Sequence, residues 1–255
     1  MPTPRSAVAS HARQGLEAAR LATETLRELV GVMDDAAVRG PSALPGWTRG
    51  HVITHLARNA DALLNLVIWA RTGVEHPMYA SAADRDADIA EGAQRMRQIQ
   101  QEDLGAACDR FFYAAERLPD SAWSAQLGQT RSGSDRTAED VPWMRLVEVL
   151  VHMVDLDSGI GFDRAVDLAG EHIGGVFDQV LRGYTGRPDL PATRLDITLP
   201  SGENRSWTFG SPDGGTDGAT DYVVSGPADA ALAWLTGRSA GENLAGEVPT
   251  LPRWL

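Results

Sequence analysis

The sequence predicts an α+β protein of two domains, an N-terminal bundle of four long helices and a smaller C-terminal domain that mixes helices with strands. Over roughly the first 160 residues, apolar side chains recur every three to four positions, the spacing of amphipathic helices. The last third changes to short alternating segments separated by Gly-rich turns, a pattern typical of strands. Because 255 residues exceed an average domain, we expect one domain over residues 1–162 and another over residues 163–255.

Turn and capping residues mark the helices of the first domain. Thr48 is expected to cap one helix, and Gly73 to end it. Ser81 with Asp84 three residues later indicates a capping box for another. The expected helices run over about residues 6–33, from a cap at Thr48 to Thr72, from a cap at Ser81 to Leu118, and from a cap at Thr137 or Asp140 to Asp157. The segments 40–46 and 126–136 are predicted loops.

The second domain is predicted to contain a hairpin. Residues 194–199 and 205–209 alternate as half-buried strands, and the turn residues 201–204 lie between them. The other expected elements are a helix over about 167–182, a Gly/Asp loop over 210–218, a strand over 220–224 and a helix over 228–236.

Composition excludes several kinds of partner. The formal charge of -12 argues against binding nucleic acid or an anionic membrane, since both need clustered Lys and Arg. The first residues do not read as a signal peptide, and no apolar run approaches the length of a membrane span. We therefore expect a cytoplasmic protein that is a monomer or small homo-oligomer, with no nucleic-acid or membrane partner.

Glu148 and His152 are the most informative pair in the chain. They lie four residues apart, and so on one helix face, in a segment that is otherwise rich in Val and Leu. A carboxylate and an imidazole are costly to bury unless something engages them, and both are ligands of first-row metals. A buried Glu/His pair without a metal is the alternative interpretation.

A second pair at the same spacing, His51 and His55, lies on another predicted helix. One of these histidines with Glu148 and His152 would complete the donor set of a catalytic zinc site, which keeps a fourth position open. Both histidines together would close the shell and favour a structural metal. The spacing does not choose between these two possibilities.

The remaining histidines and the cysteine have weaker patterns. His11, His76 and His172 have no ligand-type partner at helical spacing, and the single cysteine, Cys108, is expected to be a buried structural thiol. Asp155 is placed to accept a hydrogen bond from an imidazole N–H, or else to be solvated at the helix end.

At these residues the chain resembles the mycothiol-dependent maleylpyruvate isomerases of actinobacteria. That family combines an N-terminal helix bundle of the DinB type with a C-terminal α+β domain, so the resemblance spans both predicted domains. The C-terminal motifs are more specific than the Trp-Thr-Arg turn with its paired histidines. The matching stretches are Pro45–His55, Asn65, Pro77–Tyr79, Trp143–Arg145, Glu148, His152, Val154–Leu156, Gly237–Arg238, Gly246–Pro249 and Pro252–Leu255.

The resemblance implies roles for individual residues. It assigns His55, Glu148 and His152 as ligands of Zn²⁺ or another divalent metal, and leaves His51 as a non-ligand. It assigns Arg238 as the catalytic arginine, which in the family reaches a site between the domains. Arg85 also matches and would contact an anionic ligand such as the cofactor mycothiol, although a solvated helix charge is an alternative role for it.

The activity that the resemblance implies is cis–trans isomerisation of maleylpyruvate to fumarylpyruvate in aromatic degradation. The thiolate of mycothiol, held at zinc, would add to the cis double bond, the resulting single bond would rotate, and elimination would leave the trans isomer. The partners would be this small-molecule thiol and an electrophilic substrate.

Two other functions remain open. A mycothiol S-transferase would use the same metal and thiol on another electrophile, for detoxification or natural-product assembly. A zinc-binding regulator of sigma factors is the non-enzymatic alternative, but such proteins usually need a cysteine in the zinc motif, and Cys108 is far in sequence from the three implied ligands.

Overall fold

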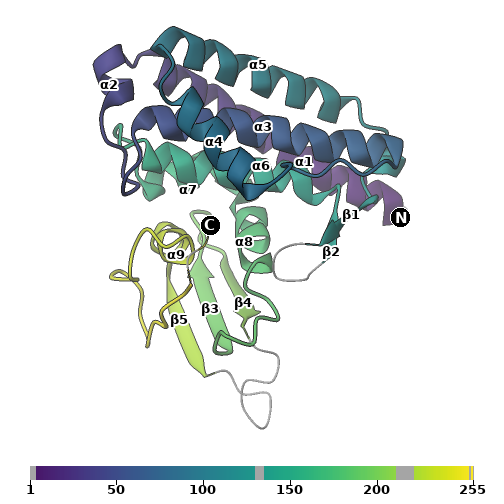
Figure 1. The fold of residues 1–255 in the computed structure, drawn as a ribbon. Coiled ribbons are helices and arrows are strands. Elements are labelled where there is room, and N and C mark those ends of the chain that lie inside the picture. Colours follow the sequence, from purple (N-terminus) through teal and green to yellow (C-terminus); the bar gives the residue numbers. More distant parts are fainter. Residues whose placement is uncertain (1–3, 130–134, 211–220, 253, 255) are drawn as a thin grey trace. The chain divides into compact units, whose positions relative to one another are not determined.

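The chain folds into two compact units (Figure 1). The computed structural model describes residues 4–129, 135–210, 221–252 and 254. One unit contains the described residues up to 128 together with 135–160, and the other begins at Gly161. Helices make up most of the first unit, and a mixed sheet lies in the second, so the predicted α+β class is confirmed.

The first unit is built on four long helices, α1, α3, α5 and α6. Helix α3 packs on α5 and α6, and α1 packs on the same two helices, so the apolar faces of all four meet in a shared core. The described elements of the unit are α1 Pro4–Gly31, α2 Asp35–Arg39, α3 Arg49–Thr72, α4 Ala82–Gly92, α5 Arg97–Glu116, a 3₁₀ turn at Asp120–Ala122, β1 Gln126–Gln129, β2 Asp135–Thr137 and α6 Asp140–Asp155.

Helix α3 begins and ends where its capping residues predict. The Thr48 side chain accepts a hydrogen bond from the backbone N–H of His51, and the His51 ring accepts one from the backbone N–H of Thr48. At the other end Gly73 adopts the left-handed conformation with φ of 71°, and its N–H bonds to the carbonyl of Trp69. These caps fix the start of the helix and therefore which residues face the core.

The prediction of one helix from Ser81 to Leu118 is wrong, because the chain breaks between α4 and α5. A Cβ on Gly92 would lie 2.4 Å from the Thr54 methyl carbon, so this glycine lets α4 approach α3 very closely. The buried Gln100 amide donates to the carbonyls of Ala93 and Arg95, which the break leaves without helical partners. Gly92 and Gln100 together therefore stabilise a turn that periodicity alone does not reveal.

Two smaller elements also differ from expectation. The helix α2 forms between the end of the first predicted helix, at about residue 33, and the predicted loop 40–46, with Asp34 as its N-cap. Strands β1 and β2 form a two-stranded sheet at the ends of the predicted loop 126–136. Helix α6 begins at Asp140 with Glu139 as its N-cap, so the prediction of Thr137 or Asp140 at that position is wrong. The Asp140 carboxylate instead accepts a hydrogen bond from the Thr137 N–H at 2.9 Å.

The second unit packs helices on a three-stranded sheet of order β4-β3-β5, counted over the described residues. Strand β3 pairs antiparallel with β4, which confirms the hairpin, and parallel with β5. The expected helix over 167–182 is in fact interrupted at Gly170, where φ is 52°. The described elements are α7 Phe162–Ala169, a 3₁₀ turn at Gly170–His172, α8 Ile173–Arg182, β3 Thr193–Thr198, β4 Asn204–Phe209, β5 Tyr222–Pro227 and α9 Ala228–Leu235.

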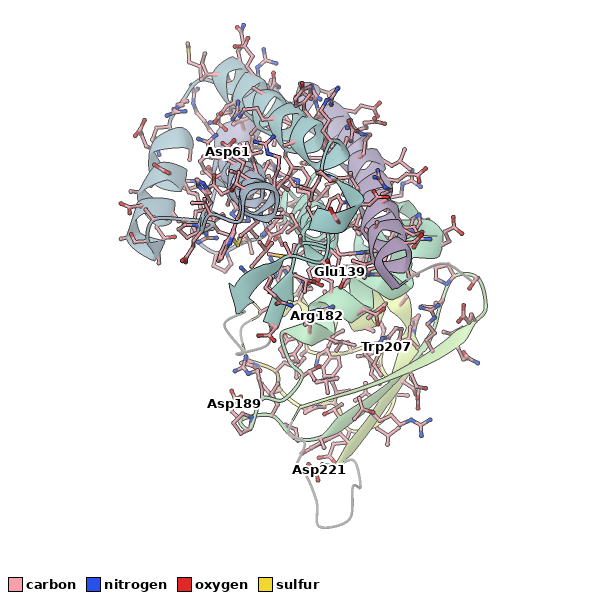
Figure 2. All side chains as sticks on the ribbon, turned by 90° about the vertical axis from the view of Figure 1, so that its right-hand side faces the viewer. Asp61, Glu139, Arg182, Asp189, Trp207 and Asp221 are labelled. Atoms are coloured by element: carbon pink, nitrogen blue, oxygen red, sulfur yellow. The ribbon has the colours of Figure 1, made fainter. Side chains whose placement is uncertain are left out.

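The sheet buries one face against its helices. Leu195 and Ile197 of β3 are buried, whereas Arg194 before them and Thr198 after them are exposed, as a period of two requires. Trp207 lies on β4 (Figure 2). Its ring is tilted against that of Phe177 on α8, with centroids 5.1 Å apart, and its indole N–H donates to Asp178 at 2.7 Å. Most of the predicted loop 210–218 lies outside the described residues. No helix in the described part of the chain is long and apolar enough to cross a membrane.

Candidate metal centre

Helices α3 and α6 bring three ligand-type atoms together inside the first unit. The His55 Nε2 atom lies 2.9 Å from Glu148 Oε2 and 3.0 Å from His152 Nε2, and the last two atoms are 3.4 Å apart. Both imidazoles are buried, and the Glu148 side chain is only 14% exposed. The residues that the resemblance assigns as ligands therefore converge on one point.

A buried arginine holds the two helices in this register. Arg145 lies one turn before Glu148 on α6 and is fully buried. Its guanidinium donates to the Leu56 carbonyl and the Asn59 side chain of α3, both at 2.9 Å. These bonds tie α6 to the turn of α3 that carries His55. Arg145 belongs to a stretch that matches the family, and an arginine in so apolar a helix is also a signal for a buried contact.

The electrostatics of His55 and Glu148 favour the forms that bind metal ions. Burial and the neighbouring His152 lower the pKa of His55 to about 4, so this ring is neutral near pH 7. Burial would raise the pKa of Glu148, but hydrogen bonds to His152 and His55 outweigh it and hold that pKa below its usual range. The carboxylate is therefore ionised beside a neutral imidazole.

Asp155 orients the third donor. Its carboxylate is completely buried and lies 2.7 Å from His152 Nδ1. Burial would lower the pKa of His152, but the hydrogen bonds to Asp155 and Glu148 outweigh it and raise that pKa. A proton held on Nδ1 by Asp155 leaves Nε2 directed at Glu148 and His55, which is how carboxylates orient metal-binding histidines. Asp155 is thus a hydrogen-bond acceptor and not a solvated helix end.

The donor set fits a divalent metal ion. Three ligands at about 2.0–2.2 Å from a tetrahedral zinc ion lie about 3.3–3.5 Å from one another. The separations of 2.9, 3.0 and 3.4 Å are close to this spacing, and two imidazoles with one carboxylate are a donor set found in catalytic zinc sites. No other group of three His, Cys, Asp or Glu side chains in the described ranges has such an arrangement.

His51 has a different function from His55, one turn later. Its Nδ1 atom lies 2.7 Å from the Thr48 hydroxyl and 3.2 Å from the Thr48 backbone nitrogen, so the ring is part of the helix cap. The group of ligand atoms does not include it. The alternative with both histidines as ligands is therefore not supported by the structure.

Two further side chains contact His55. The Trp47 ring meets the His55 ring edge to face, with centroids 5.9 Å apart. From α4, Arg85 places a terminal guanidinium nitrogen 3.4 Å from His55 Nδ1. The structure thus brings Arg85 to the centre, where sequence analysis had also considered a solvated role for it.

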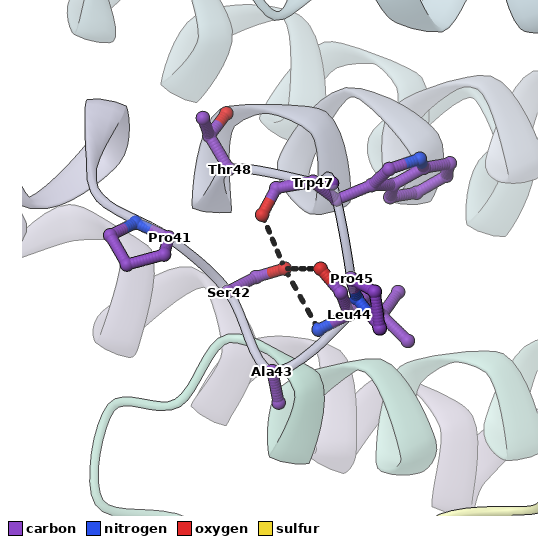
Figure 3. A pocket seen from close by; sticks show the side chains of 8 residues that line it. Pro41, Ser42, Ala43, Leu44, Pro45, Trp47 and Thr48 are labelled. Carbon is purple, nitrogen blue, oxygen red and sulfur yellow. Dashed lines mark hydrogen bonds between the residues drawn. The ribbon is translucent and has the colours of Figure 1, made fainter.

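The loop that carries Trp47 forms a pocket of its own, lined by residues 41–48 (Figure 3). Its volume is about 410 Å³, and none of the three ligand residues lines it. The Ser42 hydroxyl already bonds to the backbone of Leu44 and Trp47, and those bonds stabilise the loop. We interpret the pocket as a consequence of the turn that positions Trp47 against His55.

Arg238 lies in the second unit, at the end of α9. Gly237 has φ of 73°, and the N–H groups of Gly237 and Arg238 bond to the carbonyls of Trp234 and Ala233, the pattern of a Schellman motif. The Arg238 guanidinium donates to the Thr236 carbonyl at 2.6 Å and lies 5.5 Å from the centre of the Trp254 ring. These contacts agree with a helix-capping role, and the catalytic role remains a prediction.

Cys108 is buried, as expected, and is not among the three ligand residues. Its sulfur lies 3.1 Å from a guanidinium nitrogen of Arg145. His11 stacks on Trp143 of α6, with ring centroids 4.8 Å apart, which is a packing contact. No group of three ligand-type side chains among the described residues contains the cysteine.

The fold and the site define a class: an α+β protein of two units whose helical unit holds a buried His/Glu/His group suited to a divalent metal. Residues 19–157, more than half of the chain, match the family model described as the mycothiol maleylpyruvate isomerase N-terminal domain. The chain therefore belongs to the mycothiol maleylpyruvate isomerase family, which is a family of enzymes.

Solved structures agree with this assignment. The crystal structure of a mycothiol-dependent maleylpyruvate isomerase superposes with a TM-score of 0.76 at 28% sequence identity. A histidine-to-alanine mutant of such an isomerase gives a TM-score of 0.77 at the same identity. Each comparison covers 95% of this chain and 97% of the other. No curated protein matches the chain.

Proposed function

We propose that this protein is a metal- and mycothiol-dependent isomerase that converts maleylpyruvate to fumarylpyruvate. The observation that carries the proposal is the convergence of His55 Nε2, Glu148 Oε2 and His152 Nε2 within 3.4 Å, in the unit that matches the family. His55, Glu148 and His152 would hold a divalent ion, with zinc as the first choice for this donor set. A bound metal would favour the thiolate form of a thiol at its open position.

The charge of the three ligands suits this chemistry. Glu148 contributes a single negative charge, and the two imidazoles contribute none when neutral, so the shell neutralises only half of a divalent ion's charge. The remaining positive charge favours an anionic ligand such as a thiolate. Asp155 keeps His152 Nε2 directed inward, and the packing of Trp47 restricts the ring of His55.

Two arginines would bind the anionic groups of the ligands. Maleylpyruvate carries carboxylates, and a guanidinium binds a carboxylate through paired, charge-assisted hydrogen bonds. We assign Arg85 to an anionic group at the centre because it already contacts His55. We assign Arg238, on the strength of the family resemblance, to a carboxylate or to the oxygen that gains charge during the reaction.

The isomerisation requires the cis double bond to become single for long enough to rotate. Reversible addition of a thiolate to the carbon–carbon bond conjugated with the carbonyl accomplishes this. Elimination then restores the double bond in the trans form, and the thiol is released unchanged. The overall reaction therefore needs neither an oxidant nor a net proton.

An isomerisation assay tests the proposal. Protein loaded with zinc is given maleylpyruvate, and turnover is followed with and without mycothiol. We expect turnover only when both mycothiol and metal are present. Isomerisation that does not depend on the thiol would contradict it. A stable adduct of mycothiol with the substrate, detected by mass spectrometry in place of fumarylpyruvate, would instead identify an S-transferase.

A further inference from the structure

Arg85 connects the candidate metal centre to its surroundings through a single long contact. A terminal nitrogen of its guanidinium lies 3.4 Å from His55 Nδ1. The other terminal nitrogen pairs with Asp86 at 3.0 Å, and the guanidinium carbon lies 5.8 Å from the centre of the Tyr79 ring. Arg85 is therefore held in place by groups other than His55.

The contact with Arg85 favours one tautomer of the neutral His55 ring over the other. A guanidinium has only N–H donors, so His55 Nδ1 must supply a lone pair to it. A neutral imidazole with a lone pair on Nδ1 carries its proton on Nε2. That proton is well placed in this structure, because Glu148 Oε2 and His152 Nε2 lie 2.9 and 3.0 Å from His55 Nε2.

A metal ion requires the opposite arrangement. A neutral His55 that binds a cation through Nε2 carries its proton on Nδ1. The Nδ1–H group and the guanidinium N–H would then be two donors directed at each other at 3.4 Å. One of the two side chains must then move. Arg85 is only partly buried and can shift away from the ring, whereas His55 is held by burial and by its contact with Trp47.

We propose that binding of a divalent cation at His55, Glu148 and His152 releases Arg85 from His55 and makes its guanidinium available to a carboxylate of the incoming ligand. The released guanidinium stays beside the centre because Asp86 and Tyr79 still hold it. Asp86 is largely exposed, so this ion pair is weak and leaves Arg85 able to bind another anion. The proposal rests on the metal site of the proposed function, and adds an order of events to it.

Thermodynamic linkage turns this exchange into a measurable coupling. If the Arg85 contact and the metal exclude each other, Arg85 weakens metal binding, and a carboxylate that captures the released guanidinium strengthens it. Metal loading must strengthen carboxylate binding by the same factor. Metal-free protein would therefore bind the anionic ligand poorly, which prevents an unproductive complex.

Zinc affinity, measured by competition with a chromophoric chelator, tests the first half of the proposal. Arg85→Ala should bind zinc about three- to tenfold more tightly than wild type, the value of one hydrogen bond. Arg85→Lys keeps the charge but shortens the side chain and removes the guanidinium that contacts His55, so it should tighten binding to a similar degree. If the lysine variant bound zinc with wild-type affinity, charge repulsion alone would explain the effect of Arg85→Ala, and the proposal would be overturned.

The matched control is Arg95→Ala, which removes a charge paired with Glu91 at 2.9 Å. This variant should leave the zinc affinity unchanged.

Two further measurements test the mechanism directly. Nitrogen-15 NMR of the ring should show His55 protonated on Nε2 in metal-free wild type; protonation on Nδ1 would overturn the proposal.

Maleate, used as a small dicarboxylate probe, should tighten zinc binding in wild type and not in Arg85→Ala. No effect of maleate in wild type, or no zinc binding at all, would also overturn it. Failure of maleylpyruvate isomerisation with these results intact would instead reject the proposed substrate and leave the release of Arg85 standing.

Discussion

The two units of this chain satisfy their buried polar side chains in different ways. In the first unit, buried His152 bonds to buried Asp155, and buried Arg145 bonds to Asn59, so side chains on different turns and helices depend on one another. In the second unit, the buried hydroxyls of Thr193, Thr236 and Tyr184 each donate to a backbone carbonyl. All the buried residues of charged type in the described ranges lie in the first unit.

This difference separates buried polar groups that support the fold from those that support a site. Burying a hydroxyl that bonds to a nearby backbone carbonyl costs little free energy, because the carbonyl oxygen has a second lone pair that can accept the bond. A buried carboxylate or guanidinium is costly unless several partners surround it. Apart from Asp140 at the start of α6, the buried charged side chains of the first unit lie where α3 and α6 pack together, which is where the candidate metal centre lies.

Removing a ligand should give the largest effect. His152→Ala should lose stoichiometric metal and all turnover, because two remaining donors hold an ion far more weakly than three. Metal analysis of the purified variant is the measurement. His172→Ala, a histidine change in the second unit, is the control and should keep its metal. Metal retained in His152→Ala would remove this residue from the ligand set.

Replacing Arg238 tests whether the second unit takes part in the chemistry at all. Arg238→Ala should lower kcat/KM about 10²- to 10³-fold, the usual effect of removing one donor to developing charge, while metal content stays at the wild-type level. Steady-state kinetics with metal analysis of the same sample would show this. The exposed Arg194, paired with Asp196 at 2.9 Å, provides the control variant Arg194→Ala. If Arg238→Ala had wild-type kcat/KM, Arg238 would have no part in the reaction and only its helix-capping contacts would remain.

Neutralising Asp155 should weaken the centre without abolishing it. Asp155→Asn keeps the size of the side chain but removes the charge that holds the proton on His152 Nδ1. We expect metal affinity to fall about 10- to 100-fold, as for other partners of ligating histidines. Isothermal titration with zinc is the measurement. Affinity equal to wild type would mean that packing alone orients the ring.

A hydroxyl removed from the second unit should have the smallest effect. Thr236→Val deletes the donor to the Leu232 carbonyl, a bond of 2.7 Å, and keeps the shape of the side chain. We expect a loss of about 1 kcal/mol in the free energy of unfolding, because the carbonyl keeps its helical partner. Urea denaturation would measure it, and zinc affinity should be unchanged. A change in zinc affinity would show that the two units are not as different as their hydrogen bonds suggest.

Much of the fold and most of the site follow from local patterns in the sequence. Thr48 and Gly73 predict the ends of α3 to the residue because capping depends on the side chains themselves. The spacing of Glu148 and His152 predicts a shared helix face for the same reason. The break between α4 and α5 depends on how closely Gly92 approaches Thr54 on another helix, which no local pattern records. An arginine in the apolar helix α6 does signal a buried contact, but its partners Leu56 and Asn59 on α3 are a property of the packed unit.

The residue at which α3 begins also sets the coordination number available to a metal. His51 and His55 have the same side chain and are one turn apart, yet the cap at Thr48 occupies the first and leaves the second for ligation. A helix that began one turn earlier would leave His51 without its capping partner, and a third imidazole could then compete, as a fourth ligand, for the position that a thiol needs. If His55, Glu148 and His152 hold a metal ion, a helix cap, usually regarded as a contribution to stability, would also protect an open coordination position and with it the capacity for catalysis.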